Sequence, residues 1–170
     1  MKLARSIRFD ESDTNVFEQA ADAGEWCISG AFAFSNFTED DLTGKPRQAF
    51  RNGWLSVEGL GRSTFVATAE IESSEIDALT MKLAAHFVSA YGAPDLEAAL
   101  PVAEEELRHM LDLCEEHEPN TLLVVERNLT EDGIHEAFRA IKPAEASVVD
   151  VLGPMADHAI EMSRIADGEK

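Results

Sequence analysis

The chain has 170 residues and a formal net charge of −19, with 33 acidic against 14 basic residues. At this charge we expect nucleic acids and anionic membranes to be repelled, because both bind mainly through neutralisation of their phosphates. A hydrophobic content of 45% and a charged content of 28% are typical of a globular protein and exclude a disordered one. The length corresponds to a single domain, which we place at residues 1–166, followed by a frayed tail at 167–170.

The first 71 residues alternate between apolar and polar positions, which predicts strands at about 2–9, 25–34, 54–58 and 64–71. In the second of these, Trp26, Ile28, Phe32 and Phe34 share one face, and Gly30 between them indicates a bulge or a close backbone approach. Four strands in so short a stretch predict a mostly antiparallel sheet built from hairpins.

The pattern then changes to helical spacing and predicts helices at about 74–91, 101–117, 131–142 and 154–166. Pro101 is taken as the start of the second helix, because proline breaks a helix interior. A compact apolar run predicts one late strand near 121–126. Strands followed by helices indicate an α+β fold, with the N-terminal sheet packed by the helices.

The strongest candidate for a binding site is the segment from Lys45 to Arg62. Within an acidic chain it gathers basic and aromatic side chains between glycines, and the candidate ligand-binding residues are Lys45, Arg47, Arg51, Trp54 and Arg62. Pro46 favours a short helix there, which places Arg47 and Arg51 four residues apart on one face. Two interpretations stay open: these cations bind an external acidic group, or they pair with the carboxylates of the protein itself.

A second candidate is the polar face formed by Glu105, His109, Asp112 and Glu116 in the helix at about 101–117. Carboxylate and imidazole groups four residues apart bind metals in helix bundles, but such sites need ligands from a second helix. A solvated helix face is the alternative. We expect no metal and no cofactor.

Cys27 and Cys114 are isolated from each other and lie on apolar stretches, which favours buried, reduced thiols over a disulfide framework. The chain has no apolar run long enough to span a membrane, and its first residues have none of signal-peptide length. We therefore expect a cytoplasmic protein.

The long helix at about 74–91 extends its apolar stripe through Ala84, Val88 and Tyr91, and the strand at 25–34 has a second face of small residues. A two-fold interface commonly covers such surplus apolar surface, so we expect a homodimer. Packing within one core is the alternative.

Three stretches resemble a small bacterial family of unknown function: 3–10, 24–34 with its Gly-Glu-Trp and Ser-Gly-Ala-Phe-Ala-Phe runs, and 47–55 beginning Arg-Gln-Ala-Phe-Arg. The resemblance covers mainly the first 70 residues. It implies a protein of unassigned role and transfers no catalytic residues.

The leading hypothesis is a non-catalytic binding or accessory protein that recognises an acidic group, on a small ligand or a protein partner, through Lys45–Arg62. One rival is a small enzyme acting on a carboxylate or phosphate metabolite with His86 as general base. The other is a metal-binding protein built on Glu105 and His109. The sequence does not decide whether the protein is an enzyme, and it favours the view that it is not.

Overall fold

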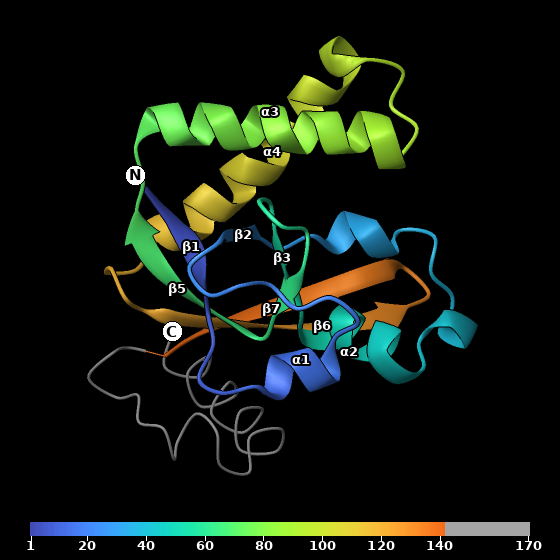
Figure 1. Ribbon diagram of the computed structural model, residues 1–170. Helices are drawn as coiled ribbons and strands as arrows, with labels where there is room; N and C mark the ends of the chain where they lie inside the picture. Colours follow the sequence, from blue (N-terminus) through green and yellow to red (C-terminus); the bar gives the residue numbers. More distant parts are fainter. Residues whose placement is uncertain (142–170) are drawn as a thin grey trace.

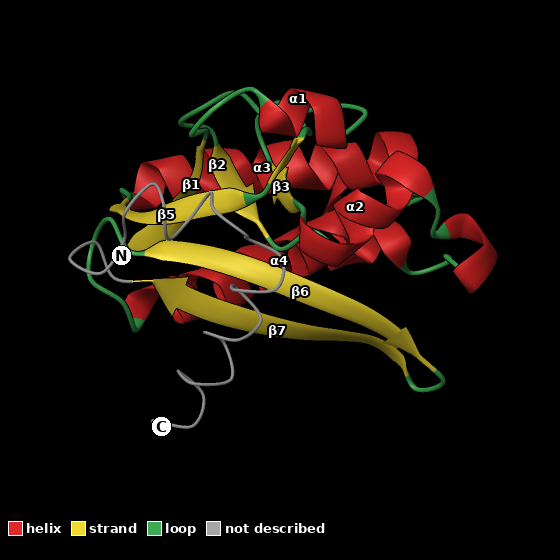
Figure 2. Cartoon of the chain, turned by 90° about the horizontal axis from the view of Figure 1, so that it is seen from below, coloured by secondary structure: helices red, strands yellow, loops and turns green. Residues whose placement is uncertain are grey.

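The computed structural model of the chain describes residues 1–141. These residues form a seven-stranded antiparallel sheet with the order β4-β3-β2-β1-β5-β6-β7. Its short strands are β1 (Lys2–Ile7), β2 (Trp26–Ile28), β3 (Trp54–Ser56), β4 (Arg62–Ser63) and β5 (Phe65–Glu70). The long strands β6 (Leu122–Thr130) and β7 (Gly133–Ile141) form a hairpin that extends from one end of the sheet (Figure 2).

Two long helices, α3 (Ser73–Ala90) and α4 (Leu96–Glu115), lie above the strands in Figure 1. Helix α4 contacts β1 and β2, and α3 packs across α4. The short helices α1 (Ser12–Val16) and α2 (Gly44–Asn52) contact each other and lie below the strands in the same view. The predicted α+β class is therefore confirmed. Within residues 1–141, no helix combines the length and the apolar character needed to cross a membrane.

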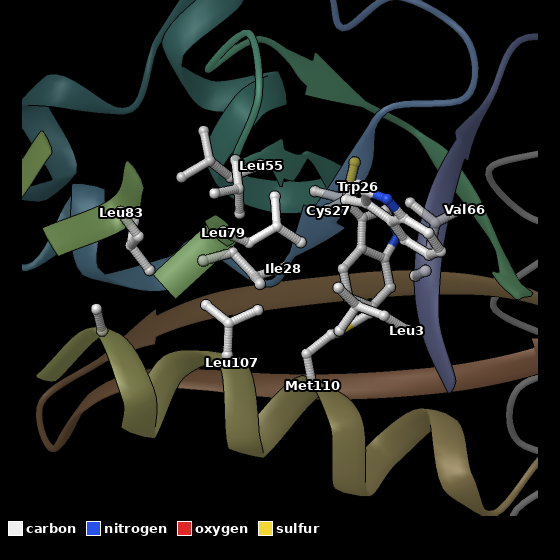
Figure 3. Close-up of a cluster of buried hydrophobic side chains, with 14 of the residues drawn as sticks. Leu3, Trp26, Cys27, Ile28, Leu55, Val66, Leu79, Leu83, Leu107 and Met110 are labelled. Carbon is white, nitrogen blue, oxygen red and sulfur yellow. The ribbon is translucent and has the colours of Figure 1, made fainter. Parts of the chain in front are cut away.

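The main core lies between α4 and the sheet. In Figure 3 the side chains of Leu107 and Met110 point from α4 toward Ile28 and Leu3. Alternate strand residues serve the two faces of the sheet, so Val66 belongs to this core while its neighbour Phe65 belongs to a smaller cluster. Each such leucine, valine or isoleucine stabilises the fold by roughly 1.5–3 kcal/mol through burial.

The sheet curls until its two ends meet. The indole of Trp54, on β3, stacks on the ring of Phe138, on β7, with 5.6 Å between ring centroids and 23° between their planes. In the strand order, β7 is the last strand at one edge and β3 is next to the strand at the other edge, so this contact joins opposite ends of the sheet. We call this junction of β3 and β7 the seam of the sheet, and α2 lies beside it against β6.

Helix α4 begins at Leu96 and not at the predicted position, and Pro101 lies inside it. The side chain of Asp95 caps the helix by accepting a hydrogen bond of 2.8 Å from the backbone N–H of Ala98. Such an N-terminal cap typically stabilises a helix by about 1 kcal/mol. Pro101 removes only one backbone donor near the beginning of a twenty-residue helix, so the helix continues through it.

The predicted strand at 25–34 is only half correct. Strand β2 ends at Ile28, and Ala31–Phe34 form a 3-10 turn. Gly30 adopts a φ of 75°, in the left-handed region, and a Cβ placed on it would lie 2.4 Å from the Cβ of Leu55. Gly30 therefore ends the strand, because the chain turns where it presses against β3.

The predicted helix at 131–142 is wrong, because Gly133–Ile141 form strand β7. The strand pairs along its whole length with β6, from Leu122 opposite Ile141 to Thr130 opposite Gly133. Only two residues connect them, and Gly133 follows with a φ of 115°. The predicted helix at 154–166 lies outside the described residues.

Candidate functional site

Helix α2 carries the basic half of the Lys45–Arg62 segment. It starts after Thr43 and ends at Gly53, whose N–H donates a 3.0 Å hydrogen bond to the carbonyl of Ala49. A Cβ on Gly53 would lie 2.8 Å from that same oxygen, so the helix end fits only a glycine closely. Phe50 is buried and anchors the inward face of the helix.

Helix α2 carries three cations of the predicted site, with Arg47 and Arg51 about 40° apart around the helix and Lys45, in its first turn, about 200° from Arg47. Lys45 and Arg47 are exposed and Arg51 is half-buried. Within residues 1–141, none of the three forms an ion pair with a carboxylate, whereas Arg108, His109 and Arg127 do. The interpretation that internal carboxylates neutralise all of these cations therefore fails for Lys45, Arg47 and Arg51 in the described part of the chain.

The structure places the other two predicted ligand residues in the interior. Trp54 is 0% exposed, and its indole N–H has no hydrogen-bond partner within the described residues. Arg62 is 8% exposed and donates hydrogen bonds to the carbonyls of Gly53 (3.1 Å) and Gly30 (3.2 Å). Its guanidinium also lies 4.7 Å from the centroid of the Phe34 ring. Trp54 and Arg62 thus lie behind α2 and not on its outward face.

Burial, followed by the nearby positive charge of Arg127, lowers the pKa of Arg62 to about 9. The side chain is still protonated at neutral pH. Its positive charge is stabilised by carbonyl dipoles and by the face of an aromatic ring.

A second buried arginine, Arg127 on β6, was not among the predicted site residues. Its side chain is 0% exposed and donates to the carbonyls of Phe50 (2.8 Å), Gly53 (2.9 Å) and Ser29 (2.6 Å). Two of these carbonyls belong to the last turn of α2 and the residue after it, whose acceptors have no partner within the helix. Arg127 therefore caps α2 at the negative end of its dipole.

The charge of Arg127 is balanced by Glu136 on β7, with 2.8 Å between Nε and Oε2. Burial lowers the pKa of Arg127, and its hydrogen bond with Glu136 opposes that shift. The hydroxyl of Ser29 donates to the same carboxylate oxygen. This network joins α2, the end of β2 and the β6–β7 hairpin at the seam of the sheet.

One sequence signal could have revealed Arg127. Leu123, Val125 and Arg127 are spaced two residues apart, so they share one face of a strand. A cation in line with two core residues must find acceptors inside the protein, because an isolated buried charge is too costly.

The predicted helical metal site does not gather a set of ligands in the described region. Glu105 pairs with Arg108 and accepts a 3.3 Å contact from Nε2 of His109. No group of three or more potential ligands forms within residues 1–141. Burial raises the pKa of Cys27 and raises that of Cys114 to about 12, so both thiols are protonated and poor nucleophiles at neutral pH.

Part of the apolar surface that suggested a homodimer is covered within the protomer. Ala84 and Cys27 are both fully buried in the main core, and Val88 packs against that core. Tyr91 is exposed, with its ring 5.3 Å from that of Phe32. The homodimer stays a prediction.

The described residues define an α+β protein with a curled antiparallel sheet, two helices on one side, and two buried arginines at the seam. A model of a family of unknown function, DUF6505, matches residues 1–158, and the chain belongs to that family. The match confirms the resemblance to an uncharacterised family and extends well beyond the first 70 residues. No curated protein and no solved structure gives a significant match.

Proposed function

We propose that this protein is a non-catalytic binding protein that recognises an acidic group of a protein partner through the unpaired cations of α2. Lys45, Arg47 and Arg51 are the contact residues. The observation that carries the proposal is that these three cations have no carboxylate partner in the described part of a chain with 33 acidic residues. Arg47 and Arg51 are one helical turn apart, so their guanidinium groups can bind neighbouring carboxylates.

The interior residues support this surface without contacting the partner. Arg62 and Arg127 both donate to the carbonyl of Gly53, directly after the last residue of α2. Asn52 adds a 3.1 Å hydrogen bond from Nδ2 to the carbonyl of Val125 on β6. A helix fixed at its C-terminal end presents its side chains with little loss of conformational entropy on binding, which favours affinity.

The charge distribution supports a selective surface. Residues 1–62 hold seven basic and ten acidic residues, a net charge of −3, whereas residues 63–170 hold seven basic and 23 acidic residues, a net charge of −16. An acidic partner is therefore repelled by most of the chain and finds favourable charges at α2. Electrostatic complementarity of this kind acts mainly on orientation and association rate.

A fluorescein-labelled decaglutamate peptide serves as the probe, with binding to the full chain followed by fluorescence anisotropy. Lys45→Glu should weaken binding about tenfold, as expected for the loss of one charge-assisted contact. Lys82→Glu is the matched control, because Lys82 is also an exposed helical lysine and undergoes the same change in charge. The double variant Arg47→Glu/Arg51→Glu should abolish binding.

The proposal is wrong if Lys45→Glu and Lys82→Glu weaken binding equally, since that result indicates a response to net charge alone. It is also wrong if the double arginine variant binds like the original chain. A urea unfolding curve for each variant shows whether a loss of binding reflects a loss of structure.

A further inference from the structure

Helices α3 and α4 line an open cavity of about 540 Å³. These two helices lie on the opposite side of the strands from α2 (Figure 1). Its apolar lining comes from Ile76 and Met81 on α3 and from Leu100 and Leu107 on α4. Leu107 is buried and lies at the bottom, whereas Met81 is 47% exposed and lies at the mouth. This volume lies within the range of about 300–1,000 Å³ that is typical of ligand-binding pockets.

The rim of this cavity is acidic. Asp77 and Glu104 line it and are exposed, and within residues 1–141 neither has a hydrogen bond or an ion pair from a side chain. Arg108 also lines the cavity, but its guanidinium is paired with Glu105. The two unpaired carboxylates therefore determine the charge that an occupant meets.

The surrounding helical layer strengthens this field. Residues 72–118 contain twelve Asp and Glu against two Lys and Arg, which gives a net charge of −10. If a second copy of the chain docked on this cavity about a two-fold axis, two such acidic layers would face each other, because a two-fold interface uses the same patch on both subunits. Phosphate-bearing surfaces are repelled for the same reason.

We propose that the α3–α4 cavity is a docking site for a cationic amphipathic helix of a protein partner. The helix inserts an apolar side chain between Met81 and Leu107, and flanking lysines or arginines bind Asp77 and Glu104. This arrangement combines an apolar groove with charge complementarity at its rim, as in other helix-in-groove interactions. The site is separate from α2 and does not depend on the function proposed there.

The test uses two fluorescein-labelled 14-residue peptides of leucine and lysine with blocked ends. In one the leucines follow helical spacing, and in the other the same residues are scrambled so that no apolar face forms. Fluorescence anisotropy with the full chain should show binding of the amphipathic peptide at least about tenfold tighter than that of the scrambled one, because only an apolar face can fill the groove.

Met81→Glu separates insertion from charge attraction. It removes the apolar mouth and adds a negative charge, so docking predicts at least about tenfold weaker binding of the amphipathic peptide, whereas attraction by charge alone predicts tighter binding. Val102→Glu is the matched control. Val102 is 53% exposed and lies 200° around α4 from Leu100, away from the cavity, so binding should stay within about twofold.

Two results overturn the proposal: Met81→Glu binds the amphipathic peptide as tightly as Val102→Glu, or the scrambled peptide binds as tightly as the amphipathic one. Sedimentation of the chain tests the other occupant. The chain must not be a dimer that Met81→Glu converts to a monomer while Val102→Glu does not. That result would assign the groove to a second copy of the chain and would overturn the proposed helical partner. If Met81→Glu lowers the urea midpoint, Met81→Gln replaces it, with the same requirement of weaker binding.

Discussion

Replacing Arg127 with methionine should lower the free energy of unfolding by about 3–5 kcal/mol. The change keeps a long side chain but removes donors to four backbone carbonyls and the partner of Glu136. Breaking one side of a buried ion pair typically costs about 3–5 kcal/mol, and each buried acceptor left without a donor costs about 1–3 kcal/mol. Because Glu136 retains access to water and some carbonyls can relax, we expect the total to stay near the ion-pair value.

The loss is a large fraction of the 5–15 kcal/mol that stabilises a typical domain, so it is readily measured. Urea unfolding of the purified variant, followed by circular dichroism, gives the free energy by linear extrapolation. The free energy of unfolding of Arg127→Lys should lie between those of the original chain and Arg127→Met. Lysine retains the charge but lacks the planar fork that reaches several carbonyls at once. Arg108→Met is the control, since Arg108 forms an exposed pair with Glu105, and its loss should stay within about 0.5 kcal/mol.

A loss below about 1 kcal/mol for Arg127→Met would refute this account. It would mean that water or another donor serves the end of α2 equally well, and that the buried guanidinium is not required to hold the helix against the sheet.

Three further predictions follow from burial. Cys27 and Cys114 are both 0% exposed with raised thiol pKa values, so a disulfide reagent should label them only after unfolding in guanidinium. Burial raises the carboxyl pKa of Glu106. The folded protein therefore binds a proton at Glu106 more tightly than the unfolded chain does. The contribution of Glu106 to stability falls as the pH rises above the ordinary pKa of glutamate. Glu106→Gln should therefore stabilise the protein at pH 7 and have little effect at pH 4, as measured by urea midpoints. Gly53→Ala should cost about 1–3 kcal/mol, because its Cβ would lie 2.8 Å from a backbone oxygen, and a drop in melting temperature checks it.

The predicted helix at 131–142 shows why apolar spacing alone misled. Ile134, Phe138 and Ile141 recur at intervals of four and three, which is typical of a helix, yet these residues form β7. Asp132-Gly133 is a strong local signal for a tight hairpin, and it was available in the sequence. Pairing with all nine residues of β6 then outweighs any helical preference.

The basic segment shows a different limit. The sequence predicted the helix and placed Arg47 and Arg51 on one face of it, because Pro46 and Gly53 mark local boundaries. The structure begins the helix at Gly44 and thereby includes Lys45. The sequence could not show that Lys45, Arg47 and Arg51 reach solvent whereas Arg62 is buried. Whether a guanidinium faces solvent or carbonyls depends on where the ends of the curled sheet meet, and that contact joins residues far apart in the chain.

The same seam determines how the two proposed surfaces relate to each other. Helix α2 is held by Arg127 and Arg62, whereas α3 and α4 are held by the apolar core against β1 and β2. Arg127→Met should therefore loosen α2 and weaken binding of the decaglutamate peptide. In conditions where the variant stays folded, it should leave binding of the amphipathic cationic peptide within about twofold, because additivity holds for distant sites without shared partners. Equal loss of both would mean that the buried arginines stabilise the whole sheet and not one helix, and the two surfaces would then have to be treated as a single coupled unit.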